Sequence, residues 1–141
     1  MSKLLARLSD PSSATVCRVA HDRDVKDCLR GAPLALSVIN LHGGKAGMLA
    51  AFARALAFPK GFGGNWDALE DCLRDLSWRA NGGEVLLLEG AHPGADLEVL
   101  TEVLQSSVEF WRGRDRPFWA VFLDPEARLA LPALYRESRG R

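Results

Sequence analysis

Three short and mostly apolar segments mark the middle and the later part of the chain. They are 34–41 (LALSVINL), 84–89 (EVLLLE) and 117–123 (PFWAVFL), and glycine, proline or asparagine residues bound them. Apolar runs of this length between turn residues are typical of strands that are buried on both faces of a sheet. We therefore predict three strands in these segments.

Amphipathic stretches separate the predicted strands. Residues 45–56 and 96–112 repeat apolar positions every three or four residues, which predicts helices. Between them, the glycine-rich segment 58–65 (FPKGFGGN) leads to Asn65, a good N-cap, and a further amphipathic helix to about Ser77. Strands alternating with helices indicate right-handed crossovers. The predicted fold class is α/β, with a small three-stranded parallel sheet packed with helices.

The two ends of the chain carry weaker patterns. Residues 1–30 are interpreted as an N-terminal extension, in which Thr15–Ala20 fits an edge strand and Arg23–Leu29 a short helix, with no indication of how they attach. The central domain is assigned to 31–124. Residues 125–141 form a basic tail, for which we expect a short helix followed by a frayed end.

Composition narrows the class of protein. Of the 141 residues, 48% are hydrophobic and 26% charged, which is typical of a globular protein and excludes wholesale disorder or a membrane protein. The N-terminus lacks the apolar region of a signal peptide, so we expect a cytoplasmic location. Cys17, Cys28 and Cys72 form no metal-ligand spacing and are expected to be reduced thiols. We predict no metal and no cofactor.

Charge is segregated although the net charge is zero. Residues 1–30 carry an excess of two positive charges and 111–141 of three, whereas 31–110 carry an excess of five negative charges. A nucleic-acid-binding domain concentrates positive charge on its folded face. We therefore expect a protein partner, and neither direct nucleic-acid binding nor membrane binding.

The helix predicted after Asn65 gathers its charges on one face. At about 100° per residue, that face holds Asp67, Glu70, Asp71, Arg74 and Asp75, opposite an apolar face. Any solvated surface helix shows two such faces. However, Asp67, Asp71 and Asp75 stand at i, i+4 and i+8, where like charges each cost about 0.2–0.5 kcal/mol. Only Arg74 offsets this repulsion, through Glu70 and Asp71. Such a row of carboxylates can take the positions of successive phosphates in a basic groove.

The stretch 58–78 (FPKGFGGNWDALEDCLRDLSW) resembles the signature of the barstar family, which consists of intracellular inhibitors of barnase-type ribonucleases. The resemblance extends over about 34–123 because the order of elements is similar. Its specific residues occur at fixed spacing without a gap: Gly63, Asn65, Asp67, Ala68, Leu69, Asp71, Cys72 and Leu73.

The resemblance implies a function without chemistry, in which the helix and its preceding loop fill the active site of a ribonuclease. By position, Asp71 resembles the central aspartate that meets the phosphate-binding groups, and Asp67 a supporting aspartate. Gly63 and Asn65 match loop positions that contact the enzyme, and Phe62 matches a loop aromatic. We predict an immunity or antitoxin-like protein that binds one basic ribonuclease, or a related nuclease toxin, as a monomer in a 1:1 complex. The predicted partner-binding residues are Phe62, Gly63, Asn65, Asp67, Glu70, Asp71, Arg74 and Asp75.

Three positions depart from the family pattern. Gly61 stands where a second loop aromatic occurs, Glu70 replaces a tryptophan, and Trp66 replaces a leucine. The family has a further acidic contact on a later helix, for which Glu109 and Asp115 are candidates without a matching motif. These differences concern the identity of the target more than the mode of binding.

Two other functions are open on the residues alone. One is an interaction module that uses the same acidic face on another basic partner without inhibiting it. The other is a small phosphate- or nucleotide-binding enzyme built around 42–47 (HGGKAG), which follows a strand and opens a helix but lacks the full GxxxxGK[ST] spacing. Catalysis by Asp67 and Asp71 is not expected, because a convex and solvated helix face cannot separate their pKa values.

Overall fold

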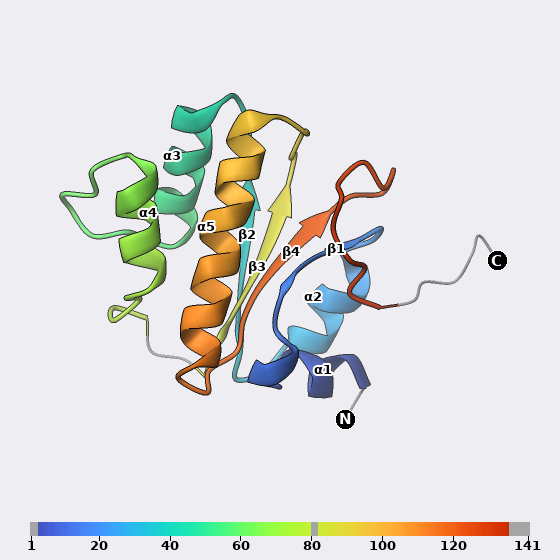
Figure 1. The fold of residues 1–141 in the computed structure, drawn as a ribbon. Coiled ribbons are helices and arrows are strands. Elements are labelled where there is room, and N and C mark those ends of the chain that lie inside the picture. Colours follow the sequence, from blue (N-terminus) through green and yellow to red (C-terminus); the bar gives the residue numbers. More distant parts are fainter. Residues whose placement is uncertain (1–2, 80–81, 136–141) are drawn as a thin grey trace.

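The computed structural model describes residues 3–79 and 82–135 of the chain, which form one parallel sheet with helices on both sides (Figure 1). Its elements, in chain order, are α1 (Lys3–Leu8), the 3-10 helix η1 (Pro11–Ser13), β1 (Val16–Val19), α2 (Arg23–Leu29), β2 (Ala35–Asn40), α3 (Lys45–Ala55), α4 (Trp66–Leu73), β3 (Glu84–Glu89), α5 (Ala95–Arg112) and β4 (Phe118–Leu123).

The sheet has four strands in the order β1-β4-β3-β2, so the prediction of three strands is wrong. The additional strand is β1, which lies within the segment Thr15–Ala20 expected to suit an edge strand and pairs in parallel with β4 from Val16 opposite Ala120 to Val19 opposite Leu123. The short helix expected at Arg23–Leu29 is likewise present as α2. Val16, Cys17 and Val19 are buried. The short apolar run of β1 suits a strand, but its partner lies about a hundred residues further along the chain. No local pattern could place it.

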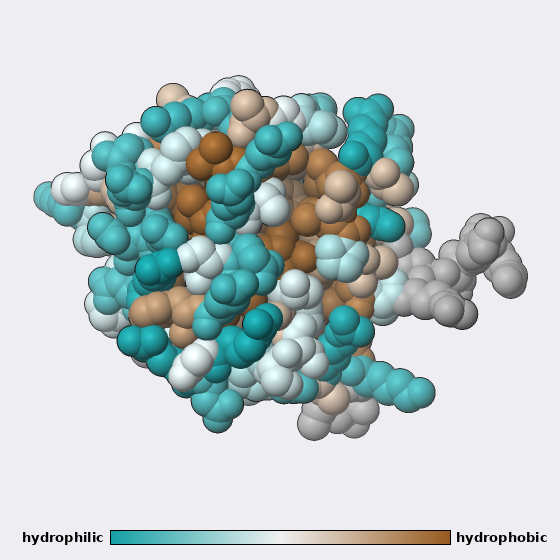
Figure 2. Space-filling view, in the orientation of Figure 1, coloured by the Kyte–Doolittle hydropathy of each residue, from teal (hydrophilic) through white to brown (hydrophobic). Residues whose placement is uncertain are grey.

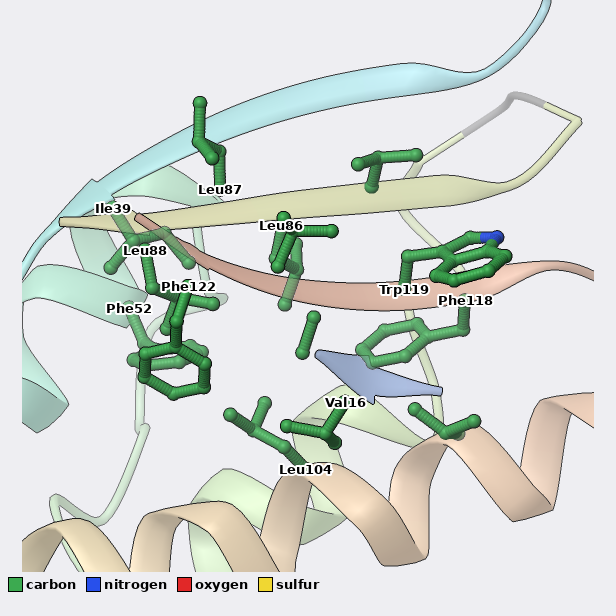
Figure 3. Close-up of a cluster of buried hydrophobic side chains, with 14 of the residues drawn as sticks. Val16, Ile39, Phe52, Leu86, Leu87, Leu88, Leu104, Phe118, Trp119 and Phe122 are labelled. Atoms are coloured by element: carbon green, nitrogen blue, oxygen red, sulfur yellow. The ribbon is translucent and has the colours of Figure 1, made fainter. Parts of the chain in front are cut away.

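The three predicted apolar segments form β2, β3 and β4, and the two faces of their sheet are covered by different helices. Leu86 and Phe122 point toward Leu104 of α5, whereas Trp119 points to the other side (Figure 3). There the indole Nε1 of Trp119 donates to the carbonyl of Leu8, at 2.9 Å. Helices α3, α4 and α5 therefore lie on one side, with α1 and α2 on the other (Figure 1).

The helix predicted to reach Ser77 is shorter than expected. Helix α4 ends at Leu73, and Leu76 adopts the left-handed backbone conformation with φ 51°. This turn buries Leu76 to 2% exposure and lets the indole Nε1 of Trp78 donate to the carbonyl of Leu56, at 2.9 Å. Burial of Leu76, together with partial burial of Trp78, thus outweighs the continuation of an exposed helix.

The segment after β4 forms no helix in its described part, so the predicted short helix is absent from 124–135; residues 136–141 lie outside the described range. The buried carboxylate of Asp124 accepts the backbone N–H groups of Arg128 and Leu129, at 3.0 and 2.9 Å. The chain then runs along the outer edge of β1 and buries Leu134 completely. In the described ranges, no helix has the length and apolar character needed to cross a bilayer.

Candidate protein-binding face

Helix α4 begins at the N-cap predicted from the sequence. Asn65 has an extended backbone, and its Oδ1 accepts the backbone N–H of Ala68 at 2.7 Å. Asp67 follows in the first turn, where a carboxylate is favoured by the positive end of the helix dipole. The cap therefore fixes the start of α4 and with it the positions of the carboxylates that follow.

The apolar side of α4 is anchored on α5. Leu69 and Leu73 are fully buried, and the indole Nε1 of Trp111 donates to the carbonyl of Leu73 at 2.7 Å. Asp67 and Asp71 lie on the opposite, exposed side, one helical turn and thus about 6 Å apart. Hydrophilic residues predominate over α4 and the outer side of α5, and hydrophobic ones show between the helices (Figure 2).

Asp75 does not continue the row on the helix, because α4 ends before it. It is exposed in the turn that follows, and its backbone N–H donates to the carbonyl of Cys72 at 3.1 Å. The prediction of three carboxylates on one helix is therefore corrected to two on the helix and one beyond its end. Ending the helix here removes one like-charge repulsion at i, i+4.

Glu70 and Arg74 are turned toward α5 rather than standing free. The Nη2 of Arg74 donates to Glu70 Oε2 at 2.9 Å, which is the i, i+4 pair expected from the sequence. The same Nη2 donates to Ser106 Oγ, and the guanidinium carbon lies 5.7 Å from the ring centre of Phe110. The charges of this pair offset each other, so the net negative charge of the face resides on Asp67, Asp71 and Asp75. Neither Ser106 nor Phe110 carries a sequence signal for this role.

The loop before α4 is held by aromatic contacts. The Phe62 ring is half-buried with its centre 4.9 Å from that of Phe58, which in turn packs edge-on to Trp78 at 6.0 Å. Gly61 and Gly64 have φ angles of 91° and 69°, a conformation that side chains disfavour. Gly63 is exposed and has no such angle. The loop thus presents Gly63 and Asn65 beside the carboxylates.

Cations border this face near the start of α4. Lys45 Nζ lies 6.0 Å from the centre of the half-buried Trp66 ring, and Lys60 is exposed in the loop. We use the name "α4 face" for the exposed side formed by Gly63, Asn65, Asp67, Asp71 and Asp75.

The start of α3, where the alternative function would bind a phosphate, already holds a carboxylate of the protein itself. The backbone N–H of Lys45, at the start of α3, donates to Asp96 Oδ2 of α5 at 3.1 Å. A Cβ added at Gly47 would lie 2.0 Å from the carbonyl oxygen of His42, so this glycine serves a close approach of the backbone. Asp96 thus already supplies the negative charge favoured at this helix start. The glycines are explained as an ordinary strand-to-helix turn.

Comparison with known families identifies the central part of the chain. Residues 37–123 match the family model described as barstar, the barnase inhibitor, which is more than half of the chain. The chain belongs to the barstar family. This family comprises ribonuclease inhibitors rather than enzymes, and it binds barnase-like ribonucleases. No curated protein matches the chain closely enough to add a relative.

The barstar-family match runs from within β2 to the end of β4 and includes the whole of α4 and its loop. It confirms the family predicted from the signature residues. The segments that form α1, β1 and α2 precede the match. The edge strand beside β4, which is β1, therefore comes from outside the matched residues. In the described ranges, no group of three or more His, Cys, Asp or Glu residues could hold a metal ion.

Cys72 of this barstar-family helix offers a probe of the local charge. Burial, together with Asp75 and Asp71, raises the pKa of its thiol above the ordinary value. Removing both charges in Asp71→Asn/Asp75→Asn should lower that pKa and speed alkylation at pH 8 by about twofold, since each like-charge contact is worth a few tenths of a kcal/mol. Mass spectrometry of alkylated peptides measures the rate. Cys28 provides the internal control, because its neighbours Asp24 and Asp27 are unchanged. An unaltered rate at Cys72 would contradict the prediction.

Proposed function

We propose that this protein binds a basic ribonuclease, or a related nuclease toxin, through the α4 face and thereby blocks the enzyme's active site. The observation that carries the proposal is the pair Asp67 and Asp71, exposed one turn apart on a helix that is capped by Asn65 and anchored by Leu69 and Leu73. The family supplies the class of partner. The spacing of Asp67 and Asp71 supplies the means by which the partner is recognised.

The physical basis is the substitution of carboxylates for phosphates. A nuclease that cleaves RNA holds its substrate's phosphates with cationic groups, and those groups attract any negative charges presented at a similar spacing. A charge that is already held in place loses little conformational freedom on binding, so a rigid carboxylate binds better than a mobile one. Because α4 is convex and its carboxylates are exposed, the face fits into a cleft rather than enclosing a substrate. This favours inhibition over catalysis.

The deciding experiment is capture from a lysate of the source cells at low and high salt. Wild-type protein is compared with Asp67→Lys/Asp71→Lys and with the control Asp24→Lys/Asp27→Lys, which changes charge equally at exposed positions of α2. We expect a nuclease on the wild-type and control baits but not on the α4 variant, and less of it at high salt. The captured enzyme should lose activity on addition of one equivalent of the protein.

Two outcomes contradict the proposal. If all three baits hold the same proteins, the α4 face is an ordinary solvated surface. If a basic protein without nuclease activity is held only by the wild-type and control baits, the face belongs to an interaction module that does not inhibit.

Substitutions at two glycines of the loop distinguish an effect on binding from an effect on folding. A Cβ at Gly63 would lie 3.4 Å from Asn65 Nδ2 and 3.6 Å from Ala68 Cβ, which are ordinary contacts. Gly63→Ala should therefore fold normally, yet weaken ribonuclease binding by about tenfold because the added methyl group separates two closely packed surfaces. Gly64→Ala should lose about 1 kcal/mol of unfolding free energy, because φ is 69° there. Thermal unfolding and titration of nuclease activity measure both effects. Equal binding by Gly63→Ala and wild type would place Gly63 outside the interface.

A further inference from the structure

The two edges of the sheet differ in whether another segment of the chain covers them. The outer edge of β1 is covered by the segment after β4: the N–H of Arg18 donates to the carbonyl of Pro132, and that of Leu134 to the carbonyl of Arg18, both at 2.9 Å. The Nε of Arg18 also donates to the carbonyl of Leu131, at 3.0 Å. β2 forms the opposite edge, and within 3–79 and 82–135 no strand pairs with its outer side.

The hydrogen-bonding groups on the outer side of β2 follow from its register with β3. The N–H groups of Ala35 and Leu41 donate to Gly83 and Glu89, at 2.9 and 2.8 Å, so the odd-numbered residues bond inward. The N–H and C=O groups of Leu36, Val38 and Asn40 therefore point outward. His42 Nδ1 lies 3.1 Å from the Asn40 carbonyl, which leaves Leu36 and Val38 as the fully open positions.

The edge strand itself lacks two common protections against pairing. Residues 34–41 contain no charged residue and no proline, which are the common devices on exposed edges. Val38 keeps 36% of its surface exposed. A hollow of about 230 Å³ runs beside the edge, and its wall on α3 includes the small side chains of Ala51 and Ala55. An incoming backbone therefore has both hydrogen-bonding partners and space.

We propose that a second copy of this chain occupies this edge, with the two β2 strands antiparallel about a two-fold axis at Val38. Leu36 of each copy then lies opposite Asn40 of the other, and Val38 meets its own counterpart, so both outward sets of groups are satisfied by the same pairing. The result is a continuous eight-stranded sheet.

A second copy presents the same uncharged strand with the same open edge. A neutral strand can face itself without placing like charges opposite each other. The cation in the hollow is Arg54, which the two-fold axis brings toward its counterpart. Salt screens this repulsion, so dimerisation should strengthen as salt rises. An acidic extended segment from another protein would instead be held by Arg54 and released by salt, which distinguishes the two occupants.

The test measures mass against concentration for the full chain by sedimentation and light scattering. Wild-type protein should pass from the monomer mass of 15.4 kDa to twice that value between micromolar and near-millimolar concentration. Val38→Lys and Val38→Glu should each raise the dissociation constant by at least about tenfold, because the axis places two like charges together. A mixture of the two variants should restore a dimer, since it pairs opposite charges at the axis. The restored dimer also shows that both variants are folded.

A matched control and a local readout complete the test. Ala130→Lys adds the same charge at an exposed position in the segment after β4 and should dimerise like the wild type. Backbone hydrogen exchange at Leu36 and Val38 should slow as the wild-type concentration rises. The proposal is overturned by a monomer at all concentrations, by a dimer that tolerates both Val38 variants, by growth beyond two copies, or by a complex with an acidic segment that salt releases.

The open edge of β2 is separate from the α4 face. The hollow is lined by β2, α3 and His42, and the α4 face contributes no residue to it. The Val38 variants should therefore bind the ribonuclease as the wild type does. A failed dimer leaves the inhibitor function intact, and a failed capture experiment leaves the dimer intact.

Discussion

Replacing Asp71 by alanine is expected to weaken ribonuclease binding by about 3–5 kcal/mol, which is roughly a hundred- to a few-thousand-fold in the dissociation constant. In the proposed complex, Asp71 faces cationic groups of the enzyme that lose their water when α4 enters the cleft. Removing the carboxylate then leaves those cations buried without a partner, which costs more than the contact itself is worth. The loss should appear mainly as a faster dissociation rate.

The fold should not change in this variant. Asp71 is exposed, and substitutions at such positions usually alter the unfolding free energy by no more than about 0.5 kcal/mol. Asp24→Ala, on α2, is the matched control because it removes one exposed carboxylate and leaves the α4 face intact. Surface plasmon resonance with the captured nuclease measures both rates. Equal dissociation rates for Asp71→Ala and wild type would rule out the mechanism.

The largest effect on stability is expected at the buried ion pair between Arg79, which follows the turn after α4, and Glu84, the first residue of β3. Glu84 has a side-chain exposure of 1%, and its Oε2 accepts the Nε of Arg79 at 2.8 Å. The Nη2 of Arg79 also donates to Ser37 Oγ, at 3.1 Å. Arg79→Met should lower the unfolding free energy by about 3–5 kcal/mol, because it removes the cation that pairs with a buried carboxylate.

A double variant separates the pair from simple packing. Arg79→Met/Glu84→Leu removes both charges together and should recover most of the stability, since apolar residues of similar volume can replace a buried pair. Urea unfolding followed by circular dichroism measures each variant. If the double variant were as unstable as Arg79→Met, the loss would come from packing and not from removal of the cation. Ribonuclease binding should survive in the double variant, because neither residue is part of the α4 face.

Local sequence was sufficient where the cause of structure is local. The capping role of Asn65 and the pairing of Glu70 with Arg74 both depend on residues within one turn, and both are present. The strands of 84–89 and 117–123 were recognisable because each contains an uninterrupted apolar run, and they form β3 and β4 almost to the residue. The signature after Phe58 was likewise contiguous, which is why the family could be recognised before any contact was known.

Local sequence failed where distant segments compete for the same residues. The periodicity of α4 continues past Leu73, but Leu76 turns inward and is buried, and the indole of the half-buried Trp78 donates to the carbonyl of Leu56. The helix was therefore ended by tertiary burial and not by a breaker residue. Similarly, the sequence of 42–47 resembles a phosphate loop. The structure shows that Asp96, about fifty residues away, accepts the backbone N–H of Lys45 at the start of α3.

For this protein, the order of hydrophobic and polar residues establishes the α/β class, the helical segments and the acidic signature, because these depend on neighbours along the chain. Contacts between remote residues establish the fourth strand, the covered edge beside Arg18 and the inward turn of Arg74 toward Ser106. Those features arise from burial and hydrogen bonding between segments whose separation in sequence leaves no periodic trace. The open edge of β2 and the exposure of two carboxylates on α4 are also decided by the tertiary structure, because they depend on which surfaces the remaining segments cover.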